Sequence, residues 1–196
     1  MLPKINAFKL KKNKSKIVCL TAYSKNIAQI IDKHTDLILV GDSLGSVLYN
    51  FKSTRSVTLD MMIKHSKSTR QGISNSLMVV DMPFNTYNNP TQALKNCKKV
   101  MKLTKCDGVK LEGGLKIIKI VKLLIKNKIP VMGHLGIMPQ FTKGKFKSKG
   151  KSVKEKKEIT RDSKLLEDAG AFSIVLECVE KNLAKEITNS ISIPTI

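Results

Sequence analysis

Residues 77–113 read LMVVDMPFNTYNNPTQALKNCKKVMKLTKCDGVKLEG, and this stretch decides the fold. It contains an apolar run at 77–82, a segment of helical period at 91–105 and a second apolar run at 108–113. Short apolar runs are typical of buried strands, and a helical crossover lets consecutive strands lie parallel. The stretch therefore predicts a strand–helix–strand unit.

The same alternation extends along the whole chain, so we predict an α/β fold with a parallel sheet. The other strand candidates are 16–22, 37–42, 129–134, 172–177 and 193–196, the last of them cut short. The other helix candidates are 24–34, 58–72, 115–127, 153–169 and 180–190. Pro90, Thr91 and Ser152 suit helix starts, and Gly72 and Gly170 suit helix ends that need a left-handed residue.

Length and hydropathy favour one domain over residues 1–196. The apolar share is 41%, and no apolar run is long enough to cross a membrane. The first 20 residues are basic and lack the apolar core of a secretory signal. We therefore expect a cytoplasmic protein without a membrane partner.

The chain carries 36 basic and 15 acidic residues, a formal net charge of +21. Such an excess raises the alternative of a non-enzymatic module that binds nucleic acid. The excess is nearly all lysine, and few aromatic side chains are available to stack on bases. We therefore expect no nucleic-acid partner, although the field should attract anionic substrates.

The four cysteines form neither a CxxC pair nor a zinc-binding pattern. We predict reduced and mostly buried thiols at Cys19, Cys97, Cys106 and Cys178. Cys178 follows a candidate catalytic residue, but a small core side chain is the simpler interpretation.

Ionisable residues recur where the predicted strands end, at Asp42, Asp81, Glu112, His134 and Glu177. The carboxyl ends of parallel barrel strands meet on one face, where the active sites of such enzymes lie. Apolar strands otherwise exclude charge unless it is paired or coordinated. The recurrence therefore predicts an active site on this face.

Three of these residues, Asp42, Asp81 and Glu112, are carboxylates that would repel one another at close range. A hard divalent cation such as Mg²⁺ would relieve the repulsion, because it prefers oxygen ligands. The alternative is that individual acids only cap the helices that follow them.

Two further residues have open interpretations. Lys110 lies two residues before Glu112, so both side chains face the same side of a strand. Lys110 could bind a substrate anion or form a structural ion pair. His134 could bind substrate or be a core histidine.

The lysine-rich segment 140–152 could be a mobile lid or a solvated loop.

Several strings resemble the ketopantoate hydroxymethyltransferase family, in the family's order and from about residue 3 to the end. VGDSLG, KLEGG and GHLG are the most specific of them. The quoted strings are LTAY (20–23), ILVGDSLGSVLYNFKST (38–54), VTLDMMIKH (57–65), DMPFNTY (81–87), VKLEGG (109–114), VMGHLGIMPQ (131–140) and VLECV (175–179).

The resemblance implies a (β/α)₈ barrel enzyme that uses Mg²⁺ and 5,10-methylenetetrahydrofolate. It would convert 3-methyl-2-oxobutanoate into 2-dehydropantoate on the pathway to pantothenate and coenzyme A, and would form a homo-oligomer. The implied roles are metal ligands at Asp42, Asp81 and Glu112, substrate contacts at Asp42, Ser43, Asp81, Lys110 and His134, and the proton acceptor at Glu177.

The chemistry is consistent with these implied roles. The C3 proton of the oxo acid is weakly acidic, and a Lewis acid on the oxo oxygen would stabilise the enolate. We expect burial to raise the basicity of Glu177, which removes this proton.

The sequence departs from the family pattern at Ser24, where an acid is common, and in the short, lysine-rich loop 140–152. It also ends after six βα units and the start of a seventh strand, whereas a barrel needs about 250 residues. We therefore predict a barrel truncated at its C-terminus. The alternatives for function are an inactive or partial fragment of the family, and a related Mg²⁺-dependent oxo-acid lyase or mutase.

Overall fold

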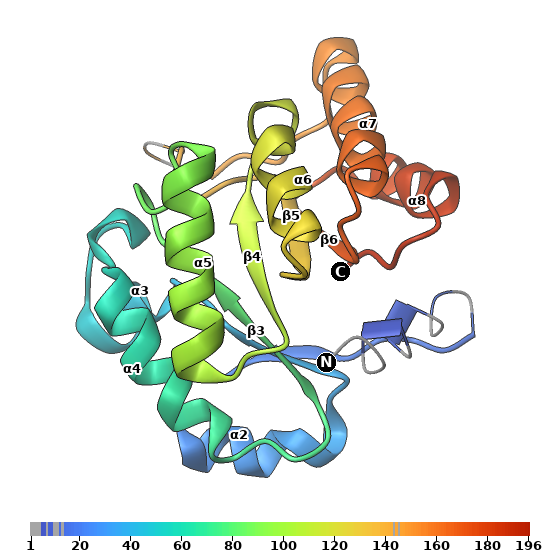
Figure 1. The fold of residues 1–196 in the computed structure, drawn as a ribbon. Coiled ribbons are helices and arrows are strands. Elements are labelled where there is room, and N and C mark those ends of the chain that lie inside the picture. Colours follow the sequence, from blue (N-terminus) through green and yellow to red (C-terminus); the bar gives the residue numbers. More distant parts are fainter. Residues whose placement is uncertain (1–4, 7, 10–11, 13, 143, 145) are drawn as a thin grey trace.

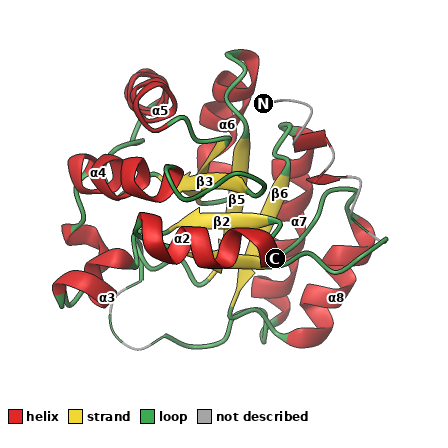
Figure 2. Ribbon diagram, turned by 90° about the horizontal axis from the view of Figure 1, so that it is seen from below, coloured by secondary structure: helices red, strands yellow, loops and turns green. Residues whose placement is uncertain are grey.

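The computed structural model describes residues 5–6, 8–9, 12, 14–142, 144 and 146–196 (Figure 1). This part of the chain forms a sheet of six parallel strands that pair in sequence order from β1 to β6. Helices surround the strands (Figure 2). The predicted α/β fold with a parallel sheet is confirmed.

The elements lie close to the predicted segments. The strands are β1 (Cys19–Thr21), β2 (Leu37–Val40), β3 (Leu77–Asp81), β4 (Gly108–Glu112), β5 (Val131–Gly136) and β6 (Ser173–Glu177). The helices are α2 (Lys25–Ile31), α3 (Leu44–Tyr49), α4 (Leu59–Arg70), α5 (Pro90–Thr104), α6 (Ile118–Lys126), α7 (Val153–Asp168) and α8 (Lys181–Ser190). Short 3-10 helices span Asp32–His34, Thr54–Ser56 and Leu115–Ile117.

The two faces of the sheet bury different residues, because successive side chains of a strand point in opposite directions. In β3, Met78 and Val80 join the large core that includes the buried helix side chains. Leu77 and Val79 face the other side and pack in a smaller cluster with Ile5 and Phe8. The same alternation places Asp81 above Val79 on this inner face.

Side-chain caps fix the helix starts that the sequence suggested. Asn89 directly precedes Pro90, and its side chain accepts a hydrogen bond from the Gln92 N–H in the first turn of α5. Ser152 accepts one from the Glu155 N–H at the start of α7. Such caps satisfy N–H groups that have no partner inside the helix.

The helices differ from the sequence prediction at two places. Helix α3 was not predicted, because six residues are too few to reveal a helical period. Gly170 has the expected left-handed backbone, with φ +95°, but the backbone of Gly72 does not have a positive φ. A Cβ at Gly72 would lie 2.3 Å from the Lys25 carbonyl oxygen, so close packing against α2 accounts for this glycine.

The end of the chain runs alongside β6. The backbone N–H of Ile174 donates to the Pro194 carbonyl, and that of Ile196 donates to the Ile174 carbonyl. The predicted last strand is present as a single parallel bridge between Ile174 and Thr195. Among the described residues, no helix combines the length and apolarity that a bilayer span requires.

Candidate active site

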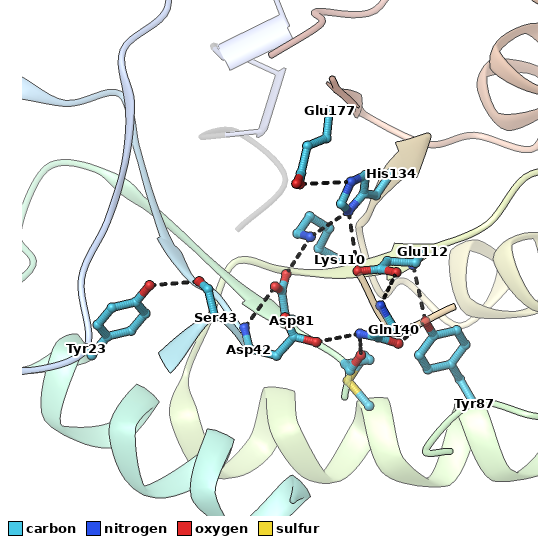
Figure 3. Close-up of polar contacts among 11 residues, drawn as sticks. Tyr23, Asp42, Ser43, Asp81, Tyr87, Lys110, Glu112, His134, Gln140 and Glu177 are labelled. Atoms are coloured by element: carbon cyan, nitrogen blue, oxygen red, sulfur yellow. Dashed lines mark hydrogen bonds and ion pairs between the residues drawn. The ribbon is translucent and has the colours of Figure 1, made fainter. Parts of the chain in front are cut away.

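The carboxyl ends of the strands open onto a cavity of about 730 Å³. All seven candidate residues from the sequence line it: Asp42, Ser43, Asp81, Lys110, Glu112, His134 and Glu177. Asp81, Lys110, Glu112, His134 and Glu177 lie on β3 to β6, and Asp42 and Ser43 follow β2. Figure 3 shows Asp81, Lys110, Glu112, His134 and Glu177 pointing toward one another. The prediction that the strand ends gather them at one place is confirmed, whereas their chemical roles stay predictions.

Lys110 lies at the centre of the group and is only 5% exposed. Its ammonium nitrogen is 3.1 Å from Asp81 Oδ1 and 3.0 Å from His134 Nδ1. Burial alone would lower the pKa of Lys110, but Asp81 and Glu112 outweigh burial and raise it. The structural ion pair considered for Lys110 is therefore present, and it lies inside the cavity.

The contact with Lys110 defines the form of His134. An ammonium group only donates, so Nδ1 must accept and the ring proton lies on Nε2. Burial, followed by the charge of Lys110, lowers the pKa of His134 and keeps the ring neutral. His134 is buried, as a core histidine would be, but it also faces the cavity.

Glu177 does not match the expected raised basicity. A hydrogen bond with His134 lowers its pKa, and burial opposes this only in part. His134 Nε2 lies 3.3 Å from Glu177 Oε2, and the glutamate side chain is 38% exposed. The expectation of a strongly buried carboxylate was wrong, because Glu177 is the last residue of β6 and its side chain is partly exposed. Glu177 is therefore ionised at neutral pH.

Glu112 is held by two residues that sequence reasoning did not single out. Its Oε2 accepts from the backbone N–H of Gln140 at 3.1 Å, and its own N–H donates to the Tyr87 hydroxyl at 3.3 Å. Gln140 and Tyr87 lie within strings that resemble the family, but both are polar residues outside the predicted strands, and nothing in the sequence indicates that they are buried. The contacts join segments far apart in the sequence, so spacing could not reveal them.

Asp42 and Ser43 follow β2 and have separate partners. The Asp42 N–H donates to Asp81 Oδ2 at 3.0 Å, and Asp42 Oδ2 accepts from the Gln140 side-chain amide at 2.8 Å. The Ser43 hydroxyl is 2.8 Å from the Tyr23 hydroxyl, a third residue that the sequence analysis missed.

The helix-capping alternative for the three acids is not supported. Ser43 precedes α3 without a side-chain cap, Asn89 caps α5, and Gly114 precedes the 3-10 helix after β4. Asp42, Asp81 and Glu112 therefore direct their oxygens into the cavity region instead of into helix starts.

The site opposes full ionisation of its carboxylates. Burial and the charge of Asp81 raise the pKa of Asp42 to about 7. Burial raises the pKa of Glu112 to about 8, although Lys110 counteracts it. Asp81 Oδ1 is also buried, with the Lys110 ammonium 3.1 Å away. These features suit an additional cation.

The acids do not form a ready-made metal cage. Within the described residues, no group of three His, Cys, Asp or Glu side chains is arranged to hold a metal ion. Lys110 and Gln140 already contact Asp81 and Asp42, which explains the difference from the expected three-carboxylate cluster. Mg²⁺ does not require such a cage, because it often binds through one or two carboxylates together with substrate and water.

The loop after β5 borders the cavity through Thr142, Gly144 and Phe146. Its far end returns to β6, where the Lys149 N–H donates to the Cys178 carbonyl. Residues 143 and 145 of the predicted lid lie outside the described residues, and lid motion stays a prediction.

The cysteines divide between the core and the surface. Cys97 and Cys106 are buried, whereas Cys178 is exposed. The interpretation of Cys178 as a core side chain was wrong, because Cys178 follows the last residue of β6 and is exposed.

The sequence signature of a family described as ketopantoate hydroxymethyltransferase matches residues 3–196. The chain is 68% identical, over its full length and 76% of the relative's length, to a 3-methyl-2-oxobutanoate hydroxymethyltransferase of Pelagibacter ubique (strain HTCC1062). It is 47% identical to the enzyme of that name from Anaplasma marginale (strain St. Maries), covering 72% of it.

Solved structures share the fold at low sequence identity. A phosphonopyruvate hydrolase in complex with oxalate and Mg²⁺ has a TM-score of 0.72 at 10% identity, with 98% of this chain and 70% of that chain covered. A 2,3-dimethylmalate lyase of the PEP mutase/isocitrate lyase superfamily has a TM-score of 0.68 at 13% identity, with 95% and 68% covered. These similarities establish the fold alone.

Proposed function

Because the chain belongs to the ketopantoate hydroxymethyltransferase family, we propose that it hydroxymethylates 3-methyl-2-oxobutanoate, with 5,10-methylenetetrahydrofolate as donor. The product is 2-dehydropantoate, a precursor of pantothenate and coenzyme A. The observation that carries the proposal is one cavity that combines a buried ammonium, buried carboxylates and a partly exposed, ionised glutamate.

The oxo acid binds at the inner end of the cavity. Its negative carboxylate is attracted to Lys110, the buried cation there, and the Ser43 hydroxyl can donate a further hydrogen bond. His134 lines the same cavity, with Nε2 3.3 Å from Glu177 Oε2. In this proposal, C3 of the substrate faces Glu177.

Glu177 is the base in this proposal. Its carboxylate takes the C3 proton, and the resulting enolate attacks the one-carbon unit that the folate supplies. Water first hydrolyses both carbon–nitrogen bonds of the methylene bridge, which leaves tetrahydrofolate and a one-carbon unit at the oxidation level of formaldehyde. C3 then forms a carbon–carbon bond to this carbon, and its oxygen takes up a proton to become the hydroxyl group of the product. Because the pKa of Glu177 is lowered, it is ionised and ready to accept a proton at neutral pH.

Asp42, Asp81 and Glu112 are the residues that would hold Mg²⁺. Their oxygens, the raised pKa values of Asp42 and Glu112 and the buried Asp81 Oδ1 support the assignment. A bound Mg²⁺ would polarise the oxo group and make the C3 proton more acidic.

The finer architecture belongs to the same proposal. Six parallel strands in sequence order, with helices outside them, are consistent with the first six units of a (β/α)₈ barrel. The proposal also includes formation of a homo-oligomer and closure of the loop 140–152 over the cavity.

Product analysis tests the activity. The chain is incubated with 3-methyl-2-oxobutanoate, Mg²⁺ and 5,10-methylenetetrahydrofolate labelled with ¹³C at the methylene carbon, and products are identified by mass spectrometry. We expect 2-dehydropantoate that carries one ¹³C. The outcome that contradicts the proposal is no labelled product together with cleavage of 2,3-dimethylmalate, as a lyase would give.

A further inference from the structure

We propose that Gln140 is a positioning residue that fixes the carboxylate of Asp42 and fastens the start of the 140–152 loop to the active site. The inference rests on the proposed function, in which Asp42 contacts both the metal and the oxo acid. Gln140 is 1% exposed although it is polar and follows Pro139 in a loop. A buried amide in such a place needs its hydrogen bonds satisfied.

The hydrogen bonds of Gln140 determine which way its amide points. Its Nε2 donates to Asp42 Oδ2 at 2.8 Å and to the Met82 carbonyl at 2.9 Å. A carbonyl oxygen only accepts, so the atom facing Met82 must be the NH₂ group. The Asp42 carboxylate is therefore held by a donor whose orientation is fixed.

The hydrogen bond to the amide oxygen of Gln140 indicates the same orientation of the side chain. Gln140 Oε1 accepts from the Tyr87 hydroxyl at 2.6 Å. That hydroxyl already accepts from the Glu112 N–H, so its own proton is free for Gln140. Tyr87 thus fixes the amide, and the amide fixes Asp42 (Figure 3).

The backbone of Gln140 connects the same loop to a second carboxylate. Its N–H donates to Glu112 Oε2 at 3.1 Å, so one residue contacts Asp42 and Glu112 together. The next residue, Phe141, packs edge-on against Phe84 with ring centroids 5.7 Å apart. The loop therefore starts from a fixed point between the ends of β3 and β4.

Two measurements on Gln140→Met test the inference. This change keeps the side-chain volume and removes both the donor and the acceptor. The first measurement is the Mg²⁺ concentration that gives half of the maximal thermal stabilisation, with Mg²⁺ alone. The second is the Mg²⁺ dependence of C3 proton exchange in 3-methyl-2-oxobutanoate, which needs no folate.

We expect the half-saturating Mg²⁺ concentration to rise about 10- to 100-fold in both measurements, as for other residues that orient metal ligands. The exchange rate at saturating Mg²⁺ should fall much less, because Glu177 is untouched. A residue with only a structural role would lower the melting temperature without this shift.

Tyr87→Phe and Gln92→Met complete the experiment. Tyr87→Phe should shift the Mg²⁺ midpoint in the same direction by less, and should add almost nothing when Gln140 is already Met. Gln92 is the control, because its amide also donates and accepts, to the Asn85 carbonyl and from the Asn88 N–H, without contacting a cavity carboxylate. Its substitution should leave the midpoint unchanged.

The outcomes separate the inference from the function. If the parent chain exchanges the proton and Gln140→Met has the parent's Mg²⁺ midpoint, the inference is wrong and the proposed function stands. If Gln140→Met does not fold, an unchanged midpoint in Tyr87→Phe overturns the inference. If the parent itself exchanges no proton, the proposed function fails and the inference fails with it.

Discussion

At the scale of single residues, the positive charge of the buried Lys110 partly offsets the negative charges of several acids in the site. Lys110 contacts Asp81 and His134, and its charge acts on Glu112 as well. A buried charge that loses its partner is costly, whereas an exposed ion pair contributes little. The position of the ammonium group should therefore matter for stability as well as for substrate binding.

Lys110→Met should lower the free energy of unfolding by about 3 kcal/mol, because it leaves buried carboxylates without their cation. Urea denaturation at neutral pH measures the change. Lys64→Met is the matched control, since Lys64 pairs with Asp60 at 2.8 Å on an exposed helix surface. Equal changes in the free energy of unfolding for the two substitutions would contradict this account, because the buried pair would then contribute no more than the exposed pair.

At the scale of elements, the site depends on how closely neighbouring strands approach where they end. Gly136 is the last residue of β5 and pairs with Glu177 in β6. Its backbone has φ +91°, and a Cβ there would lie 2.1 Å from the Glu177 carbonyl oxygen. A glycine at this position lets β6 present Glu177 next to His134.

Gly136→Ala should therefore destabilise the protein by more than about 2 kcal/mol and reduce proton exchange, since the end of β6 must move. Gly144→Ala is a suitable control. Gly144 also has a positive φ, of +80°, but a Cβ there meets nothing within 4 Å. Comparison of thermal melts gives the result, and equal losses would mean that backbone strain alone matters.

The segment after α8 is attached to α7 by Glu167. Its carboxylate accepts from the Ser192 N–H and hydroxyl, and it pairs with Lys164. Burial acts against ionisation, but the hydrogen bonds from Lys164 and Ser192 prevail and lower the pKa of Glu167 to about 2. A lowered pKa favours the folded state only while the group is ionised.

This stabilisation should be complete above about pH 4.5, the ordinary glutamate range, and should disappear as the pH falls toward 2. Glu167→Gln should thus cost about 2 kcal/mol at pH 7, and the difference from the parent should shrink below pH 4. Urea midpoints across this pH range measure it. Glu158→Gln is the control, because Glu158 is exposed on the same helix, and its substitution should change the stability little at pH 7. A loss of stability for Glu167→Gln that stays constant from pH 7 to pH 2 would contradict the account.

At the scale of the whole molecule, local pattern could predict the frame of the fold and the strand ends. The apolar runs give β2 to β6, and the acids at their ends reach the cavity because parallel strands align their carboxyl ends. Pattern could not predict α3, which is shorter than two helical turns. It also could not predict Gln140 and Tyr87, whose burial depends on contacts between distant segments.

The error about Glu177 has the same origin. The sequence places it after a buried strand, which suggested a desolvated carboxylate. Its basicity depends on how far β6 extends and on the neighbouring imidazole of His134, 3.3 Å away. Both are properties of the assembled sheet, so only the structure could provide them.

The central claim is that Glu177 removes the C3 proton of the oxo acid, and proton exchange tests it most directly. The chain and its Glu177→Gln variant are each mixed with Mg²⁺ and 3-methyl-2-oxobutanoate in deuterated water, and the C3 signal is followed by NMR. The account predicts exchange with the parent chain and a rate at least about 100-fold lower with the variant. Equal exchange by the two proteins would contradict it.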